Sequence, residues 1–146
     1  MKIYVASSWR NAQQPAVVQA LQEAGHAVYD FRNPRPEQHG FAWSDVDPNW
    51  QSWTVQGFRK GLRHPIAQDG FALDLAGLDA ADVCVLALPC GRSAHLEAGY
   101  AVGQGKQLVI LSTEPMEPEL MYIWASYIVT SIPEMLERLQ DIAEGA

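Results

Sequence analysis

The chain has 146 residues, of which 48% are hydrophobic, and its formal net charge is −7. This length and apolar content predict a single folded domain and exclude a disordered chain. The acidic balance excludes polymeric nucleic acid as a partner, because such binders need a basic surface, but it allows a small nucleoside or nucleotide as ligand.

Strands and helices are predicted in alternation along the chain. Strands are expected at 2–6, 26–29, 83–88, 106–111 and 127–129, and helices at 15–25, from 69 to about 80, at 93–102, near 120 and after a capping box at 131–134. This alternation is typical of an α/β fold with a parallel sheet and right-handed crossovers.

Nothing in the chain predicts secretion or insertion into a membrane. Met1 leads directly into the first strand without the pattern of a signal peptide, and no apolar stretch has the length of a membrane span. Cys84 and Cys90 are the only cysteines, too few for a disulfide framework. We therefore expect a cytoplasmic protein that has no membrane partner.

A segment rich in Trp, Pro, Asp and Gln, at about 31–68, interrupts the alternation. It is long for a connection inside one domain, and such connections are typically functional loops or lids. Its aromatic residues have two interpretations: they stack a flat heterocycle, or they form a small core that holds the segment together. For any single Trp the small core is the more common use. We treat the segment as an insert in one domain that spans 1–146.

The most informative motif is the apolar run 83–88 followed by a turn at Gly91 and a helix that carries Glu97. Ligands of parallel sheets bind outside the carboxyl ends of the strands. Ser93 is predicted as the N-cap, which places Glu97 in the first turn, where the helix dipole favours its ionised form. An ionised carboxylate there is a candidate nucleophile. The alternative is a surface Glu that only balances the dipole.

Asp74 is a second candidate, because its spacing from Phe71 and Leu78 places a carboxylate at the edge of the apolar stripe of its helix. Such a position is costly unless the group is paired or useful. The alternative is a boundary residue that reaches solvent. The histidines show no metal-ligand spacing, so no metal site is predicted.

Polar side chains also follow the first strand. Ser7, Ser8 and Arg10 suit an oxyanion such as phosphate, and Arg92 adds a second guanidinium near the Glu97 motif. An ordinary polar turn explains them equally well. Tyr4, within the strand, presents its hydroxyl to the same crevice or is a core tyrosine.

These residues resemble the nucleoside 2-deoxyribosyltransferase-like superfamily, which includes transferases and 2'-deoxynucleoside 5'-monophosphate N-glycosidases. The resemblance covers the chain except the insert, and it rests on 3–10, on Asp74 with 81–83, and on 91–101. The most specific part is Glu97-Ala98-Gly99-Tyr100-Ala101 after the glycine turn. The resemblance implies a flavodoxin-like, Rossmann-like three-layer fold with a five-stranded parallel sheet, in homodimers or larger assemblies.

The resemblance also implies roles. Glu97 matches the catalytic nucleophile, Asp74 the aspartate that assists at the base or orients the sugar, and Tyr4 the tyrosine that orients the glutamate. The implied reaction is cleavage of an N-glycosidic bond through a covalent glycosyl-enzyme, with transfer to water or another base and without a cofactor. The alternative is a non-catalytic module on the same fold that binds or senses a nucleotide.

The chain departs from the family pattern at two positions. Gly91 stands where the transferases carry a further aspartate, and Glu119, two residues before Met121, stands where the hydrolases place a phosphate-binding Ser from the partner subunit. Ser8-Trp9-Arg10, in contrast, fits the Ser-x-Arg of the hydrolases. The sequence therefore leaves open hydrolase or transferase, and 5'-phosphate or free 5'-hydroxyl, which Glu119 could hydrogen-bond.

Overall fold

The computed structural model describes residues 1–145 and divides the chain into two compact units. The first unit consists of Met1–Asp30 together with the residues from Leu78 onward, and the second is Phe31–Gly77. The second unit thus begins where the predicted insert begins and continues past Gln68.

The first unit is built on a five-stranded parallel sheet with the order β2-β1-β3-β4-β5. Its strands are β1 (Lys2–Ala6), β2 (Ala27–Asp30), β3 (Val83–Ala87), β4 (Gln107–Leu111) and β5 (Tyr127–Val129). Ala6 pairs with Leu86, and Ala87 pairs with Leu111, so the carboxyl ends of the central strands lie at one edge. The predicted α/β, flavodoxin-like architecture is confirmed.

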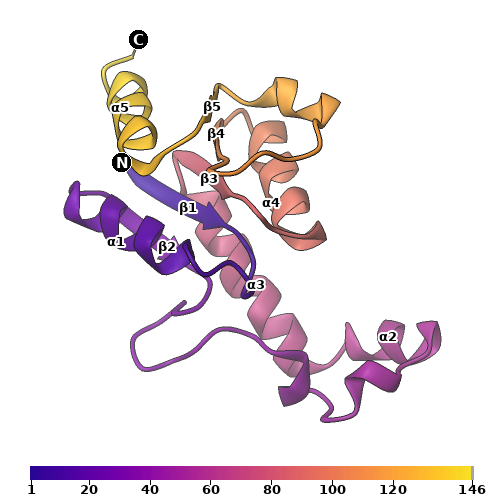
Figure 1. The fold of residues 1–146 in the computed structure, drawn as a ribbon. Helices are drawn as coiled ribbons and strands as arrows, with labels where there is room; N and C mark the ends of the chain where they lie inside the picture. The colour runs from indigo at the N-terminus through magenta and orange to yellow at the C-terminus, as the bar shows by residue number, and fades with distance from the viewer. Residues whose placement is uncertain (146) are drawn as a thin grey trace. The chain divides into compact units, whose positions relative to one another are not determined.

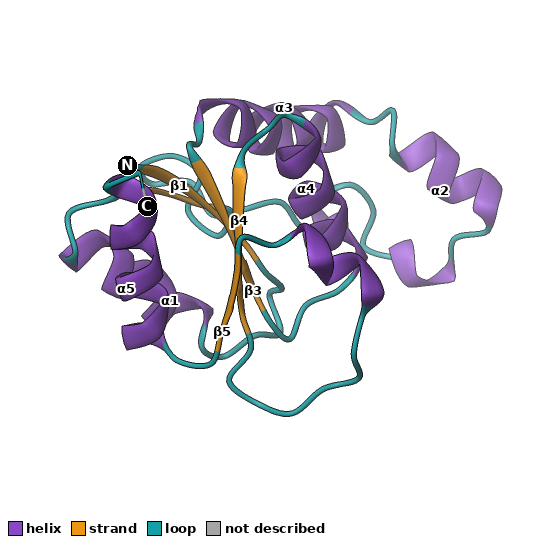
Figure 2. Ribbon diagram, turned by 90° about the horizontal axis from the view of Figure 1, so that it is seen from above, coloured by secondary structure: helices purple, strands orange, loops and turns teal. Residues whose placement is uncertain are grey.

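Helices cover both faces of this sheet (Figure 2). α1 (Gln14–Glu23) and α5 (Ile132–Ala143) pack on one face, and α4 (Arg92–Gly103) packs on the other. Alternate strand residues point to opposite faces, so Val83 and Val85 join the core under α1 and α5, whereas Cys84 and Leu86 join the core under α4. Burial on both faces explains the continuous apolar runs of the strands.

Three helices begin earlier than the sequence predicts, α1 by only one residue, at Gln14. α3 (Pro65–Ala80) starts four residues before Asp69, with Pro65 in the first helical position, where its missing N–H costs nothing. α4 starts at Arg92, and its N-cap is Gly91 in an extended conformation. The prediction of Ser93 as N-cap is therefore wrong, because Arg92 and Ser93 already lie in the first turn.

The second unit contains the 3-10 helices η1 (Trp43–Asp45) and η2 (Trp50–Ser52), the helix α2 (Val55–Gly61) and the part of α3 up to Gly77 (Figure 1). Trp53 is central: its ring contacts Trp43 edge-on at 5.6 Å between centroids, and its Nε1 donates to Asp47 Oδ2 at 2.7 Å. Trp43 also contacts Phe41 and Phe58. These contacts favour the small-core interpretation of the aromatic residues. Among the described residues, no helix has both the length and the apolar character needed to cross a membrane.

Candidate functional site

A buried asparagine joins the two turns at the carboxyl edge of the sheet. Asn11 is 3% exposed, and its Nδ2 donates to Ser7 Oγ at 3.1 Å and to the carbonyls of Ala87 at 3.2 Å and Pro89 at 3.4 Å. Ser7 Oγ itself donates to the Ala87 carbonyl at 2.8 Å. Ser7, a predicted binding residue, therefore helps to fix the turn after β1 against the turn after β3. Sequence reasoning missed Asn11, whose carbonyl partners Ala87 and Pro89 lie far along the chain.

Glu97 lies in the second turn of α4, because the helix begins at Arg92. Its predicted place in the first turn is therefore wrong, and the helix N-terminus contributes less to its ionisation. The carboxylate is half-buried and accepts a hydrogen bond from Ser93 Oγ at 3.4 Å. Burial, and secondly the negative charge of Glu97, raise the pKa of both Cys84 and Cys90 to about 12. The carboxylate is therefore close to β3 and to the turn that follows it.

Tyr4 is fully buried, and its ring stacks on Tyr29 at 5.1 Å between centroids with planes 7° apart. It belongs to the core between the sheet and α4, together with Ala94 and Ala98 of that helix. The core interpretation of Tyr4 thus holds for its ring. A role for its hydroxyl toward Glu97 stays a prediction.

Two arginines lie at this edge, Arg10 in the turn after β1 and Arg92 at the first position of α4. Arg10 and Arg92 are exposed, and within the part of the chain that the structure describes neither takes part in an ion pair. Ser8 Oγ accepts from the Arg10 backbone N–H at 3.1 Å, which closes a short turn. Ser8 therefore stabilises the turn that carries the Arg10 side chain. The α4 N-terminus has no side-chain cap, so its first amides are not satisfied by a capping side chain.

Glu119 and Met121 stand at the start of the 3-10 helix η3 (Leu120–Trp124). The Glu119 carboxylate accepts from the Met121 backbone N–H at 3.2 Å and so caps this helix. Four side chains of η3 are exposed although they are apolar: Leu120, Met121, Ile123 and Trp124. Tyr122, the fifth residue, is half-buried and packs against the core under α4.

His95 is a second residue that sequence reasoning did not connect to the site. Its Nδ1 lies 2.7 Å from the Gly91 carbonyl oxygen, and its Nε2 lies 2.8 Å from the Tyr122 hydroxyl. The sequence offered one signal, the position of His95 one turn after Gly91 on the predicted helix. Nothing local indicated Tyr122, which lies 27 residues further along the chain.

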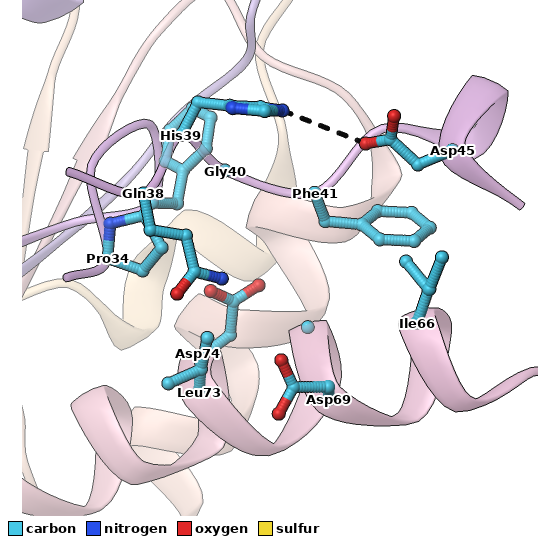
Figure 3. A pocket seen from close by; sticks show the side chains of 12 residues that line it. Pro34, Gln38, His39, Gly40, Phe41, Asp45, Ile66, Asp69, Leu73 and Asp74 are labelled. Carbon is cyan, nitrogen blue, oxygen red and sulfur yellow. Dashed lines mark ion pairs between the residues drawn. The ribbon is translucent and has the colours of Figure 1, made fainter.

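Asp74 belongs to the second unit, unlike the other candidates, and lines a cavity of about 360 Å³ within that unit (Figure 3). Its carboxylate points toward the Gln38 side chain. Asp45, which lies 3.8 Å from His39 Nε2, and Asp69 also line the cavity. No Lys or Arg is among these described lining residues, so the cavity suits a ligand that presents N–H donors rather than an anion.

Two solved structures have a fold similar to this chain. A 2-deoxyribosyltransferase from the psychrotolerant bacterium Bacillus psychrosaccharolyticus is 18% identical, with a TM-score of 0.62 over 93% of this chain and 90% of that one. The Clostridium botulinum CMP N-glycosidase BcmB is 15% identical, with a TM-score of 0.54 over 96% of this chain and 99% of that one. No family model and no curated protein matches the sequence. The predicted resemblance is thereby confirmed at the level of the fold.

Proposed function

We propose that this chain is an enzyme that cleaves the N-glycosidic bond of a (2'-deoxy)ribonucleoside or of its 5'-monophosphate. Glu97 acts as the nucleophile, and the glycosyl group passes from it to water or to another nucleobase. The ligand is a small molecule, and the reaction uses no cofactor.

In the first step a Glu97 carboxylate oxygen attacks C1' of the sugar, and the C1'–N bond breaks with its electron pair leaving on the base. Asp74, or a water that it holds, supplies the proton that the departing base takes up. The product of this step is a glycosyl ester on Glu97 and a free base.

In the second step water or a second base attacks C1' from the opposite face and releases the Glu97 carboxylate. The attacking group loses a proton as the bond forms, and Asp74 or its water takes that proton back. Two displacements retain the configuration at C1'. Hydrolysis and transfer differ only in the acceptor of this second step.

One observation carries the proposal. In a fold shared with a deoxyribosyltransferase and an N-glycosidase, the single carboxylate of α4 is half-buried close to the end of β3. Its neighbour Ser93 is a neutral donor that leaves the carboxylate ionised. A carboxylate in this position has a lone pair for attack.

We further propose that the protein is a homodimer or larger homo-oligomer. Leu120 and Ile123 are 74% and 79% exposed, and Met121 and Trp124 are exposed beside them on η3. A contiguous apolar patch of this kind is typical of a protein interface. Light scattering at micromolar concentration should give a multiple of the chain mass, and Ile123→Glu should lower it.

The proposed activity is tested by base release from a panel of purine and pyrimidine nucleosides, ribo and deoxy, each with and without a 5'-phosphate. Wild-type protein should release base from at least one member, and Glu97→Gln should not. Glu23→Gln, an exposed change on α1, is the matched control and should behave as wild type.

The outcomes separate the alternatives. Nuclear magnetic resonance of the sugar gives the configuration of the product at C1'. Retention of that configuration supports a covalent intermediate. Binding of a nucleotide without base release from any panel member would instead make the chain a non-catalytic binding module. Equal turnover by Glu97→Gln and wild type would remove Glu97 from the chemistry.

A further inference from the structure

One imidazole joins two segments of the candidate site. His95 Nδ1 lies 2.7 Å from the Gly91 carbonyl oxygen, which can only accept a hydrogen bond. The Nδ1 atom therefore carries the proton, and in the neutral ring Nε2 is the acceptor. The Tyr122 hydroxyl, 2.8 Å from Nε2, must then donate to it. The two contacts together define a single tautomer and a single ring orientation.

The rings of the same two side chains are also nearly parallel. The His95 and Tyr122 rings have centroids 5.8 Å apart and planes 13° apart. Tyr122 is the residue of η3 that packs, half-buried, against the core under α4, while its four neighbours in η3 are exposed. The His95–Tyr122 pair is therefore a principal attachment of η3 to the rest of the first unit.

Each side of the pair leads to candidate site residues. Gly91 is the N-cap of α4, and its carbonyl also accepts from the His95 backbone N–H at 3.4 Å, so both contacts fix the turn before Ser93 and Glu97. On the other side, Met121 directly precedes Tyr122, and Glu119 stands three residues before Tyr122. A shift of the His95 ring would therefore move both sides at once.

We propose that His95 is a positioning residue which, through Tyr122, fixes the start of α4 against η3 and so sets the position of Glu97. This inference rests on the proposed function for its effect on turnover. Its structural part, the coupling of the two segments, stands on the contacts alone.

The geometry gives His95 no acid–base role of its own. Both ring nitrogens are engaged by protein atoms, so neither has a proton or lone pair for a substrate. It also does not activate Cys90, whose Sγ lies 3.8 Å from Nδ1. Burial and the charge of Glu97 raise the pKa of this thiol to about 12, so it stays protonated at neutral pH.

Cys90 provides a reporter that needs no substrate. Cys84 is fully buried in β3, so alkylation of the folded chain by N-ethylmaleimide occurs at half-buried Cys90, next to the Gly91 turn. Tyr122→Phe removes only the hydroxyl and keeps the stacked ring. We expect it to loosen the turn and raise the alkylation rate several-fold. Tyr100→Phe, which removes a hydroxyl bonded to Asp79 elsewhere on α4, should leave the rate unchanged.

The second measurement is the turnover of any substrate that the panel identifies. Small misplacements of catalytic groups have large effects, so Tyr122→Phe should lower kcat by about tenfold with KM little changed. His95→Asn, which keeps a donor near the Nδ1 position, should retain more activity than His95→Ala. Tyr100→Phe should turn over as wild type.

The inference is overturned if Tyr122→Phe is alkylated at the wild-type rate, or if nitrogen resonances of the wild-type ring show the proton on Nε2. An inactive wild type in the panel would reject the proposed function, yet the alkylation and tautomer measurements would still decide the coupling. If Tyr122→Phe is alkylated faster but keeps the wild-type kcat, the positioning role is overturned, and the His95–Tyr122 contact is purely structural.

Discussion

The α4 and α5 helices begin in opposite ways, although a serine stands near the start of each. At α5 the Ser131 hydroxyl accepts from the Glu134 backbone N–H at 3.2 Å, and the Glu134 carboxylate accepts from the Thr130 N–H at 2.7 Å. At α4 no side chain caps the helix, and the Gly91 carbonyl accepts from the side chain of His95 in the same helix. The α5 start is thus satisfied by its own side chains, whereas the first amides of α4 lack a capping side chain.

This contrast predicts that changes at the α4 start affect activity and changes at the α5 start affect stability. The largest effect is expected at Glu97. Glu97→Ala should lower base release by roughly 10³-fold or more, since it removes the nucleophile. The melting temperature should stay close to that of wild type, because the side chain is only half-buried. Azide should restore part of the turnover by attacking C1' in place of the carboxylate. Wild-type activity in this variant would contradict the assignment.

The next effect concerns the 5' substituent. An Arg–phosphate contact contributes about 1.5–3 kcal/mol, which corresponds to about 10- to 100-fold in kcat/KM. Arg10→Ala should therefore lose about that factor on a 5'-monophosphate and little on the free nucleoside. The measurement compares both forms of one substrate. Equal losses on both forms would make Arg10 a structural residue of its turn.

A matched pair of serine substitutions tests the contrast directly. Ser131→Ala removes a helix cap and should cost about 1 kcal/mol, or about 3–5 °C in Tm, without a change in kcat. Ser93→Ala removes no cap, so Tm should be unchanged, while the loss of its contact with Glu97 should alter turnover. Thermal melts and initial rates of both variants provide the comparison. Loss of stability in Ser93→Ala would mean that the α4 start is capped after all.

The smallest effect is the pH dependence of the α5 cap. Hydrogen bonds from the Thr130 backbone and side chain lower the pKa of Glu134 below its usual value of 4.5. A lowered pKa in the folded state means stabilisation that is present above pH 4.5 and lost as the pH falls through the folded value. The stability difference between wild type and Glu134→Gln should therefore shrink between pH 6 and pH 3 in denaturant titrations. A difference that is constant with pH would exclude this role for Glu134.

Local patterns account for what the sequence predicted correctly. The apolar runs of β1 and β3, the alternation of strands and helices, and the Ser131 cap each depend on residues within one turn or one strand of each other. Such features need no knowledge of distant partners. The resemblance around Glu97 predicted the flavodoxin-like fold, which the solved structures confirm.

What the sequence did not predict depends on contacts between distant residues. Asn11 bonds the Ala87 carbonyl across 76 residues, and His95 reaches Tyr122 across 27. In the insert, glycines lower the helix propensity of α2, yet Gly61 is required because a Cβ there would clash with the Trp53 ring. The length and composition of the segment indicated a loop, whereas packing around Trp53 produces a helix there.

The covalent role of Glu97 is tested by the intact mass of the protein, quenched in acid during turnover of an active substrate. We expect a species heavier than the chain by one glycosyl group, mapped by peptide sequencing to Glu97 and absent in Glu97→Gln. Turnover without any adduct, and with inverted configuration at C1', would contradict it and show that water attacks the sugar directly.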